Sequence, residues 1–331
     1  MDLALRPMST SQVLDRTFYL YRNNFVLFAG IAIVTPALNL IAQMVQLKIF
    51  GPLTVPQDPA NLNQQFFSAF IVRIIVSVLV GSIIYLTGTA MASSATAYAV
   101  SMVHLGKTTT IAESYSRVKS VFFRIVWLLT RIVVFTLGPL MLCYVLFFGL
   151  IFVMPRLAKG GGGQGTLIIG AIIGVLLGMV GFLGGLVWMF YALCRYALAV
   201  PACTLENMPA GKSMARSRFL TRGVKWSILG IVLLTWLMSF ILTYVLQLPA
   251  LLAGHSIVMT ARSHLSVAAT SWIYFAQFLG VTLSGPITTI ALVLVYYDQR
   301  VRKEAFDLQL MMEAVGQQAQ AQPAAAASGI G

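Results

Sequence analysis

The chain has 331 residues, of which 59% are hydrophobic and only 9% are charged, and its formal net charge is +13. Soluble domains average about 25% charged residues, so this composition excludes a soluble globular protein and indicates one that crosses a membrane several times. The positive charge does not indicate nucleic-acid binding, because the sequence contains no separate basic domain that could form such a surface.

Six apolar segments are long enough to cross a bilayer as helices, which takes about 20 residues. The segment before the first of them, MDLALRPMSTSQ, lacks the pattern of a cleavable signal peptide, so we expect the first span to be retained. The predicted fold class is therefore all-α, a polytopic membrane helical bundle of six transmembrane helices. The predicted spans are residues 25–46, 69–98, 124–154, 167–198, 226–250 and 269–297.

Lysine and arginine are distributed unevenly between the two sides of these spans. One side holds Arg6, Arg16, Arg22, Lys107, Arg117, Lys119, Arg124, Arg195, Lys212, Arg216, Arg218, Arg222, Lys225, Arg300, Arg302 and Lys303. The other side holds only Lys48, Arg156, Lys159 and Arg262. The positive-inside rule then predicts that both termini are cytoplasmic, in a multi-pass protein of the cell membrane.

Similar features recur along the chain at intervals of about one hundred residues. Tyr98, Tyr196 and Tyr296 each end an apolar segment, and the apolar stripe from Leu14 to Phe25 recurs from Ile111 to Phe122. We interpret residues 1–316 as one membrane domain of three repeat units, about 9–105, 106–205 and 206–316. Each unit would be an amphipathic cytoplasmic helix followed by a two-span hairpin; chance similarity between apolar segments is the alternative. Residues 317–331 are predicted to form a disordered low-complexity tail.

The segment after the sixth span, YYDQRVRKEAFDLQ, concentrates charge that is scarce elsewhere. Arg300 and Glu304, like Lys303 and Asp307, are four residues apart, which places each pair on one face of a helix. A helix with one charged and one apolar face is typical of the membrane interface.

This segment resembles the closing motif of a bacterial membrane domain family named after glycerophosphoryl diester phosphodiesterases. RSRFLTRGVKWSILGI, which begins at Arg216 and follows Glu206, resembles the second motif of that family, and STSQVLDRTFYLYRNNFVLFAGI near the start is also similar. In the family the phosphodiesterase activity belongs to a separate soluble barrel, whose catalytic carboxylates and histidines have no counterpart in this sequence. The resemblance therefore implies a membrane fold in the bacterial inner membrane and does not imply the activity.

The sequence offers two kinds of candidate site. The first is a set of interaction positions, Glu206, Arg216, Arg218, Arg222, Asp298, Arg300, Arg302, Glu304 and Asp307. The second is a set of polar side chains on the outer halves of spans one and five, Asn39, Gln43, Gln46, Ser239, Thr243 and Gln247. Such groups need partners or water in a membrane, so they form either interhelical hydrogen bonds or a polar cavity between these two spans.

Catalytic, cofactor and metal sites are not indicated. No aspartate or glutamate lies within a predicted span, which weakens a proton-coupled carrier, and His255 and His264 share a loop without a third ligand nearby. The sequence therefore favours a non-catalytic membrane scaffold that binds anionic lipid headgroups or a protein partner through basic cytoplasmic helices. The alternative is a permease or lipid-handling transporter component that uses the polar cavity.

Glycines recur along one face of the fourth predicted span, at Gly170, Gly174, Gly178, Gly181 and Gly185. Small residues at this spacing let helix backbones approach closely in lipid. The pattern predicts tight packing of this span against a neighbouring helix, and a pore lined by glycine is the alternative.

Overall fold

The computed structural model describes residues 8–51, 64–158, 164–259 and 267–304, and each regular element in these ranges is a helix. The prediction of an all-helical fold is confirmed. The helices are α1 (Thr10–Asn23), α2 (Phe25–Ala32), α3 (Val34–Phe50), α4 (Gln64–His104), α5 (Ile111–Lys119), α6 (Phe122–Ala158), α7 (Gln164–Tyr196), α8 (Ala199–Leu205), α9 (Ala210–Leu220), α10 (Lys225–Met259) and α11 (Val267–Glu304).

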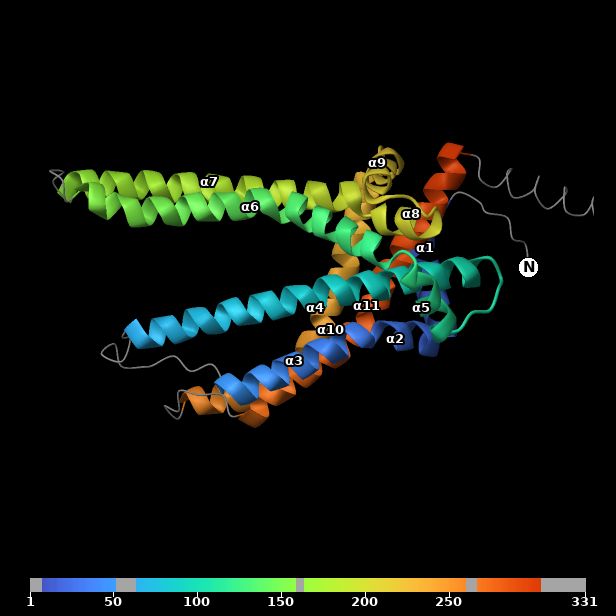
Figure 1. Cartoon of the computed structure of the whole chain (residues 1–331), viewed down its shortest axis with the longest axis horizontal. Helices are drawn as coiled ribbons and strands as arrows, with labels where there is room; N and C mark the ends of the chain where they lie inside the picture. The colour runs from blue at the N-terminus through green and yellow to red at the C-terminus, as the bar shows by residue number, and fades with distance from the viewer. Residues whose placement is uncertain (1–7, 52–63, 159–163, 260–266, 305–331) are drawn as a thin grey trace, which may run out of the picture.

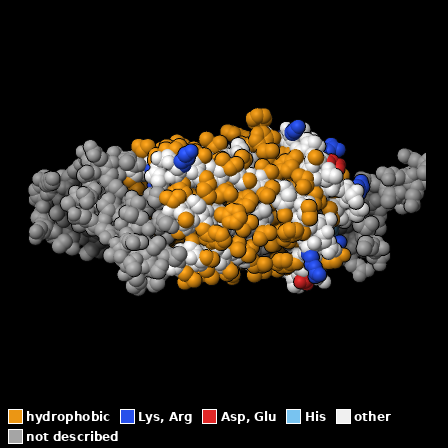
Figure 2. Space-filling view, turned by 90° about the horizontal axis from the view of Figure 1, so that it is seen from below, with side chains coloured by type: hydrophobic (Ala, Val, Ile, Leu, Met, Phe, Trp, Pro, Cys, Tyr) orange, Lys and Arg blue, Asp and Glu red, His pale blue; other side chains and the backbone are white. Residues whose placement is uncertain are grey.

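Six helical segments of the described chain are long and apolar enough to cross a membrane, as predicted. They are Phe25–Phe50, Phe70–His104, Phe122–Val145, Gly174–Leu205, Lys225–Leu252 and Val267–Glu304. Figure 2 shows the corresponding band of hydrophobic side chains around the middle of the molecule, with charged side chains near its ends. The chain is a multi-pass membrane protein.

The short helices α1, α5, α8 and α9 gather at one end of the molecule, on the right in Figure 1. We call this the short-helix end. Two of these helices begin with side-chain caps: Ser9 and Gln12 form a reciprocal capping box on α1, and Thr110 accepts a hydrogen bond of 3.2 Å from the amide of Glu113 on α5. Short helices therefore precede spans one and three, and their amphipathic character stays a prediction. The threefold repeat stays a prediction.

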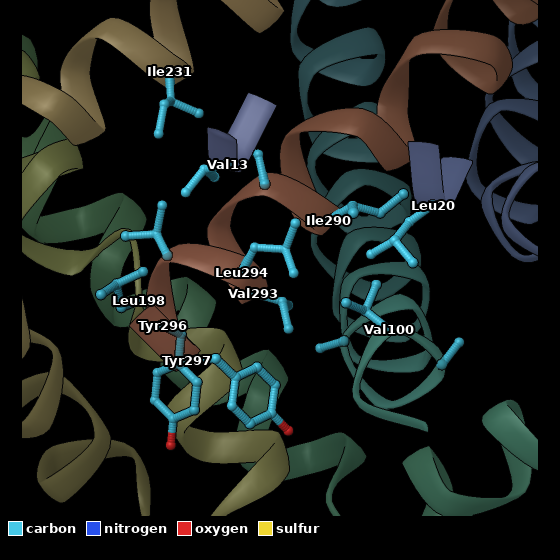
Figure 3. Packing of buried hydrophobic residues seen from close by; sticks show 14 of the residues in the cluster. Val13, Leu20, Val100, Leu198, Ile231, Ile290, Val293, Leu294, Tyr296 and Tyr297 are labelled. Atoms are coloured by element: carbon cyan, nitrogen blue, oxygen red, sulfur yellow. The ribbon is translucent and has the colours of Figure 1, made fainter. Parts of the chain in front are cut away.

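Helix α11 forms the centre of the bundle. In its most apolar stretch 56% of the residues are buried, against at most 22% in the other candidate spans. Figure 3 shows how Ile290, Leu294 and Tyr296 of α11 pack among side chains from other helices, which include Val13, Leu20, Val100, Leu198 and Ile231. The end of α11 therefore lies where many elements meet.

The glycine face of span four packs against α6, as predicted. A Cβ added at Gly185 would lie 3.3 Å from the backbone of Leu140, one added at Gly181 would lie 3.5 Å from Cys143, and one added at Gly178 would overlap the ring of Phe147. Gly174 differs, because nothing lies within 4 Å of its added Cβ, and the surroundings of Gly170 are outside the described residues. Close packing of α6 and α7 thus depends on Gly178, Gly181 and Gly185.

Candidate functional site

A group of charged side chains joins α8, α9 and α11 at the short-helix end. It consists of Glu206, Arg216, Tyr296, Arg300 and Glu304, and we call it the Arg216 cluster. Tyr296, Arg300 and Glu304 are four residues apart along α11 and therefore share one face of that helix. Glu206 ends α8, and Arg216 lies in α9.

Arg216 contacts both carboxylates of the cluster. Its Nε lies 3.1 Å from Glu206 Oε2, and its Nη2 donates to Glu206 Oε1 at 3.0 Å and to Glu304 Oε2 at 2.6 Å. Its Nη1 donates to Glu304 Oε1, and the Tyr296 hydroxyl donates to Glu206 Oε1. Planar guanidinium groups favour such two-pronged contacts, which fix direction as well as distance.

The charges within the cluster balance. Arg300 Nε lies 3.6 Å from Glu206 Oε1 and 3.5 Å from Glu304 Oε2, so two carboxylates face two guanidinium groups. Burial disfavours the charged form of Arg216, but its hydrogen bonds to Glu304 and Glu206 outweigh that effect and raise its pKa above the ordinary value. The cluster therefore holds helices together and leaves no unbalanced positive charge for an anionic ligand.

The loop after Glu206 is held by a contact with α6. Asn207 has a positive φ of 51°, a conformation that asparagine tolerates better than most residues. Arg124 Nη1 donates to the Asn207 backbone oxygen at 2.8 Å and to its side-chain oxygen at 2.7 Å. This contact positions Glu206 for Arg216, and it could not be predicted from the sequence because 83 residues separate the two partners.

A second ionic contact joins the N-terminal segment to α11. Asp298 is only 7% exposed; its Oδ2 lies 2.9 Å from Arg302 Nε, and its Oδ1 accepts from the amide of Met8 at 2.7 Å. Arg302 Nη2 in turn donates to the Met8 carbonyl at 2.7 Å. Both charges are thus used to bind the backbone just before α1.

Lys303 binds the C-terminal end of α9. Its Nζ donates to the carbonyls of Phe219 at 3.1 Å, Leu220 at 2.9 Å and Arg222 at 2.7 Å. The last carbonyls of a helix lack partners within the helix and carry partial negative charge, so an ammonium group there is favourable.

The structure divides the predicted interaction residues into two groups. Six of them form the internal contacts described above, namely Glu206, Arg216, Asp298, Arg300, Arg302 and Glu304. Arg218 of α9 and Arg222, just after this helix, instead have exposed side chains, as does Lys212 of α9, and we call these three residues the α9 surface. Asp307 lies outside the described residues. Within those residues, no group of three metal-binding side chains is close enough to hold an ion.

A polar cavity lies beside the first span, but its walls are not the predicted ones. A cavity of about 400 Å³ is lined by residues of the first span, α4 and α11, including Asn39 and Gln43. Gln43 Nε2 approaches Gln277 Oε1 of α11 at 3.4 Å, and Gln46 accepts a hydrogen bond of 2.9 Å from Ser77 of α4. The polar cavity therefore lies between span one and span six, whereas we predicted that it would lie between span one and span five.

The polar residues of span five were assigned to this cavity incorrectly. None of the cavity's described lining residues comes from α10. Ser239 donates to the Thr235 carbonyl of its own helix at 2.8 Å, while Thr243 lies against Gly280 of α11. Gln247 does not line the cavity either. The reason is that α10 packs along α11 in a close pair, where hydroxyls can be satisfied by backbone and need no water-filled space.

Two prolines lie within the helices that line the cavity. Pro36 and Pro286 both line it, and neither can donate to the carbonyl four residues earlier. Two tyrosine hydroxyls bind backbone carbonyls a few residues before these prolines. Tyr115 of α5 donates to the carbonyl of Ile31 at 2.6 Å, and Tyr21 of α1 donates to that of Leu283 at 2.7 Å. Burial raises the pKa of Tyr115 to about 12, so this hydroxyl stays protonated and remains a donor.

Comparison with known families agrees with the resemblance seen in the motifs. Residues 166–323 match the family model for the membrane domain of glycerophosphoryl diester phosphodiesterase, so this resemblance is confirmed over the C-terminal part of the chain. All five residues of the Arg216 cluster lie in the matched range. No curated protein and no solved structure matches the chain.

Proposed function

We propose that the chain is a non-catalytic membrane scaffold that binds anionic lipid headgroups through the α9 surface. The observation that supports this most is the division of the arginines of α9: Arg216 is neutralised by two carboxylates, whereas Arg218 is exposed. Binding by the exposed residues would leave the internal contacts unchanged. The Arg216 cluster would then keep α9 in a fixed position at the membrane surface.

The surroundings of the α9 surface fit a lipid headgroup layer. Other exposed basic residues belong to the short-helix end or the loops beside it, namely Arg16, Arg22, Lys107, Arg117 and Lys119. Trp226 and Phe123 are 85% and 83% exposed, and aromatic side chains, tryptophan above all, are favoured at membrane interfaces. A surface that combines basic and aromatic side chains is attracted to anionic headgroups both electrostatically and by burial.

The proposed orientation places the short-helix end and both termini in the cytoplasm and the protein in the inner membrane. The excess of lysine and arginine at that end supports this orientation under the positive-inside rule. Anionic lipid on the cytoplasmic side would then face the α9 surface.

Replacing both Arg218 and Arg222 with glutamine should weaken binding to anionic lipid. Each basic residue near an anionic surface contributes about 1 kcal/mol, so the double change should lower affinity roughly tenfold to thirtyfold. The measurement is binding of purified protein in nanodiscs to fluorescent phosphatidylglycerol. Lys48→Gln, an exposed lysine of α3 at the opposite end, is the matched control and should leave the affinity unchanged. Equal affinity of the double variant and the unchanged protein would contradict the proposal.

The proposed orientation predicts which introduced cysteines react from outside the cell. Lys212→Cys should react with a membrane-impermeant maleimide only after the membrane is opened, whereas Lys48→Cys should react in intact cells. Cys194 and Cys203 are buried and should add little background, and replacing the half-buried Cys143 with serine in every variant removes the third thiol. Labelling of Lys212→Cys in intact cells would show that the orientation is reversed.

The polar cavity supports a second candidate function, a permease or lipid-handling transporter component. Its walls carry amides and hydroxyls within membrane-spanning helices, and one of these, the first span, is divided into α2 and α3 at Ile33, close to Pro36. Interrupted helices commonly line transport sites in membranes. Movement of a labelled lipid between leaflets of a reconstituted vesicle, abolished by Asn39→Leu, would favour this function over the scaffold.

A further inference from the structure

Two cavities of different character meet at one face of α4. The polar cavity described above lies between α3, α4 and α11, and a second cavity of about 520 Å³ is lined by α4, α6, α7 and α10. Gly81 and Tyr85, one helical turn apart on α4, line both of them. Each volume falls in the range of sites for small ligands.

The polar cavity offers hydrogen bonds but no charge. Its lining includes Thr35, Asn39, Gln43, Thr89, Ser93 and Gln277, and none of its lining residues is acidic or basic. It extends along α4 from Gly81 to Thr96, which is roughly 22 Å at 1.5 Å per residue. The hydrocarbon core of a bilayer is about 30 Å thick, so a ligand here would lie within the membrane, where an unpaired charge is costly.

The second cavity suits a hydrocarbon chain. Its walls are mainly aliphatic and aromatic side chains such as Val78, Leu137 and Trp236. One exception is Thr136, which is 3% exposed and whose hydroxyl has no hydrogen-bond partner. The hydroxyl of Thr35, at the polar cavity, is likewise buried without a partner. Buried polar groups without partners are rare and cost about 1–3 kcal/mol each, and an ester carbonyl or a hydroxyl of a ligand would remove that cost.

Space for a ligand to cross between the cavities exists at Gly81. No heavy atom lies within 4 Å of a Cβ added at this position. A larger residue there would fill the crossing without displacing packed backbone. Gly81 thus provides a way to close the connection while leaving the surrounding helices in place.

We infer that the two cavities form one binding site for a single uncharged lipid with a hydroxyl-bearing headgroup. The headgroup lies against Asn39 and Gln43, and one acyl chain passes over Gly81 into the cavity beside Trp236. The absence of charge in both linings selects against anionic lipids. This site is therefore distinct in place and in chemistry from the α9 surface, and the inference concerns binding whether or not the lipid is moved.

Quenching of tryptophan fluorescence by a diacylglycerol with brominated acyl chains tests this site in the purified full-length protein. We expect saturable quenching that is lost in Trp236→Phe. Gly81→Leu should weaken it about tenfold or more, a change of at least 1.4 kcal/mol in binding free energy. The matched control is Gly230→Leu, since Gly230 of α10 also has open space around it and lines neither cavity. It should bind as the unchanged protein does.

Two further probes test the headgroup. Phosphatidic acid with the same brominated chains and a brominated alkane should both bind more weakly than the diacylglycerol, and Asn39→Leu should reduce that preference. The inference is overturned if either probe quenches as effectively as the diacylglycerol, or if Gly81→Leu binds it normally. Should Gly81→Leu not fold, Asn39→Leu alone decides the question. Replacing Arg218 and Arg222 with glutamine should leave diacylglycerol binding unchanged, which separates this site from the proposed scaffold function.

Discussion

Replacing Arg216 with methionine should lower the free energy of unfolding by about 2–3 kcal/mol. The change leaves the carboxylates of Glu206 and Glu304 close together with only Arg300 to balance them. Removing one partner of a buried ion pair costs about 3–5 kcal/mol. The expected loss is smaller here because the three side chains are 12–22% exposed, and water screens them in part. Thermal unfolding in detergent, followed by circular dichroism, is the measurement.

The matched control for this experiment is Arg218→Met on the same helix. Its side chain is exposed, so its replacement should change stability by no more than about 0.5 kcal/mol. Similar losses in the two variants would contradict the structural role assigned to the Arg216 cluster. Binding to anionic lipid should fall more in Arg218→Met than in Arg216→Met, because Arg218 would contact the headgroups directly.

Gly280→Leu should destabilise the protein by about 2–3 kcal/mol, through separation of α10 from α11. A Cβ at position 280 would lie 3.0 Å from the Cα of Thr243 and would overlap its hydroxyl. Because the obstacle includes backbone, a change of rotamer cannot relieve it, and overpacking of this kind costs about 1–3 kcal/mol. The loss should be visible in the thermal unfolding of the purified protein.

Gly230→Leu in α10 is the appropriate comparison for Gly280→Leu. Nothing lies within 4 Å of a Cβ added at Gly230. Leucine is also a better helix former than glycine, by somewhat less than about 1 kcal/mol. The control should therefore be as stable as the unchanged protein or slightly more stable. Equal destabilisation by the two substitutions would indicate a general effect of leucine and would contradict the close approach at Gly280.

The spans could be predicted from sequence because their signal is local. Each segment is apolar over a length that matches the bilayer, and each predicted span overlaps one of the six apolar helical segments that the structure shows. The short helices before spans one and three were also predictable, since Ser9 and Thr110 stand at their starts as capping residues. The division of the first span at Ile33 was not expected, although Pro36 lies close behind it.

The partners of the charged residues could not be predicted in the same way. The sequence placed Arg300 and Glu304 on one helical face, and this spacing is confirmed by a contact of 3.5 Å. It gave no means of seeing that Arg216 reaches Glu304 across 88 positions or that Asn207 meets Arg124. The assignment of Ser239, Thr243 and Gln247 to the cavity failed for the same reason, because a polar stripe shows which face is polar and does not show which helix it meets.

The contact of Met8 with Asp298 and Arg302 has a consequence for how the protein is made. Met8 is separated in the sequence from Asp298 by 290 positions and from Arg302 by 294 positions. At about 5–20 residues per second, a ribosome needs roughly 15–60 seconds after Met8 to add residue 298. During that interval the earlier spans enter the bilayer while the start of the chain still lacks the carboxylate and guanidinium that hold it. A nascent chain released before α11 is complete therefore lacks the two contacts that hold the backbone at Met8.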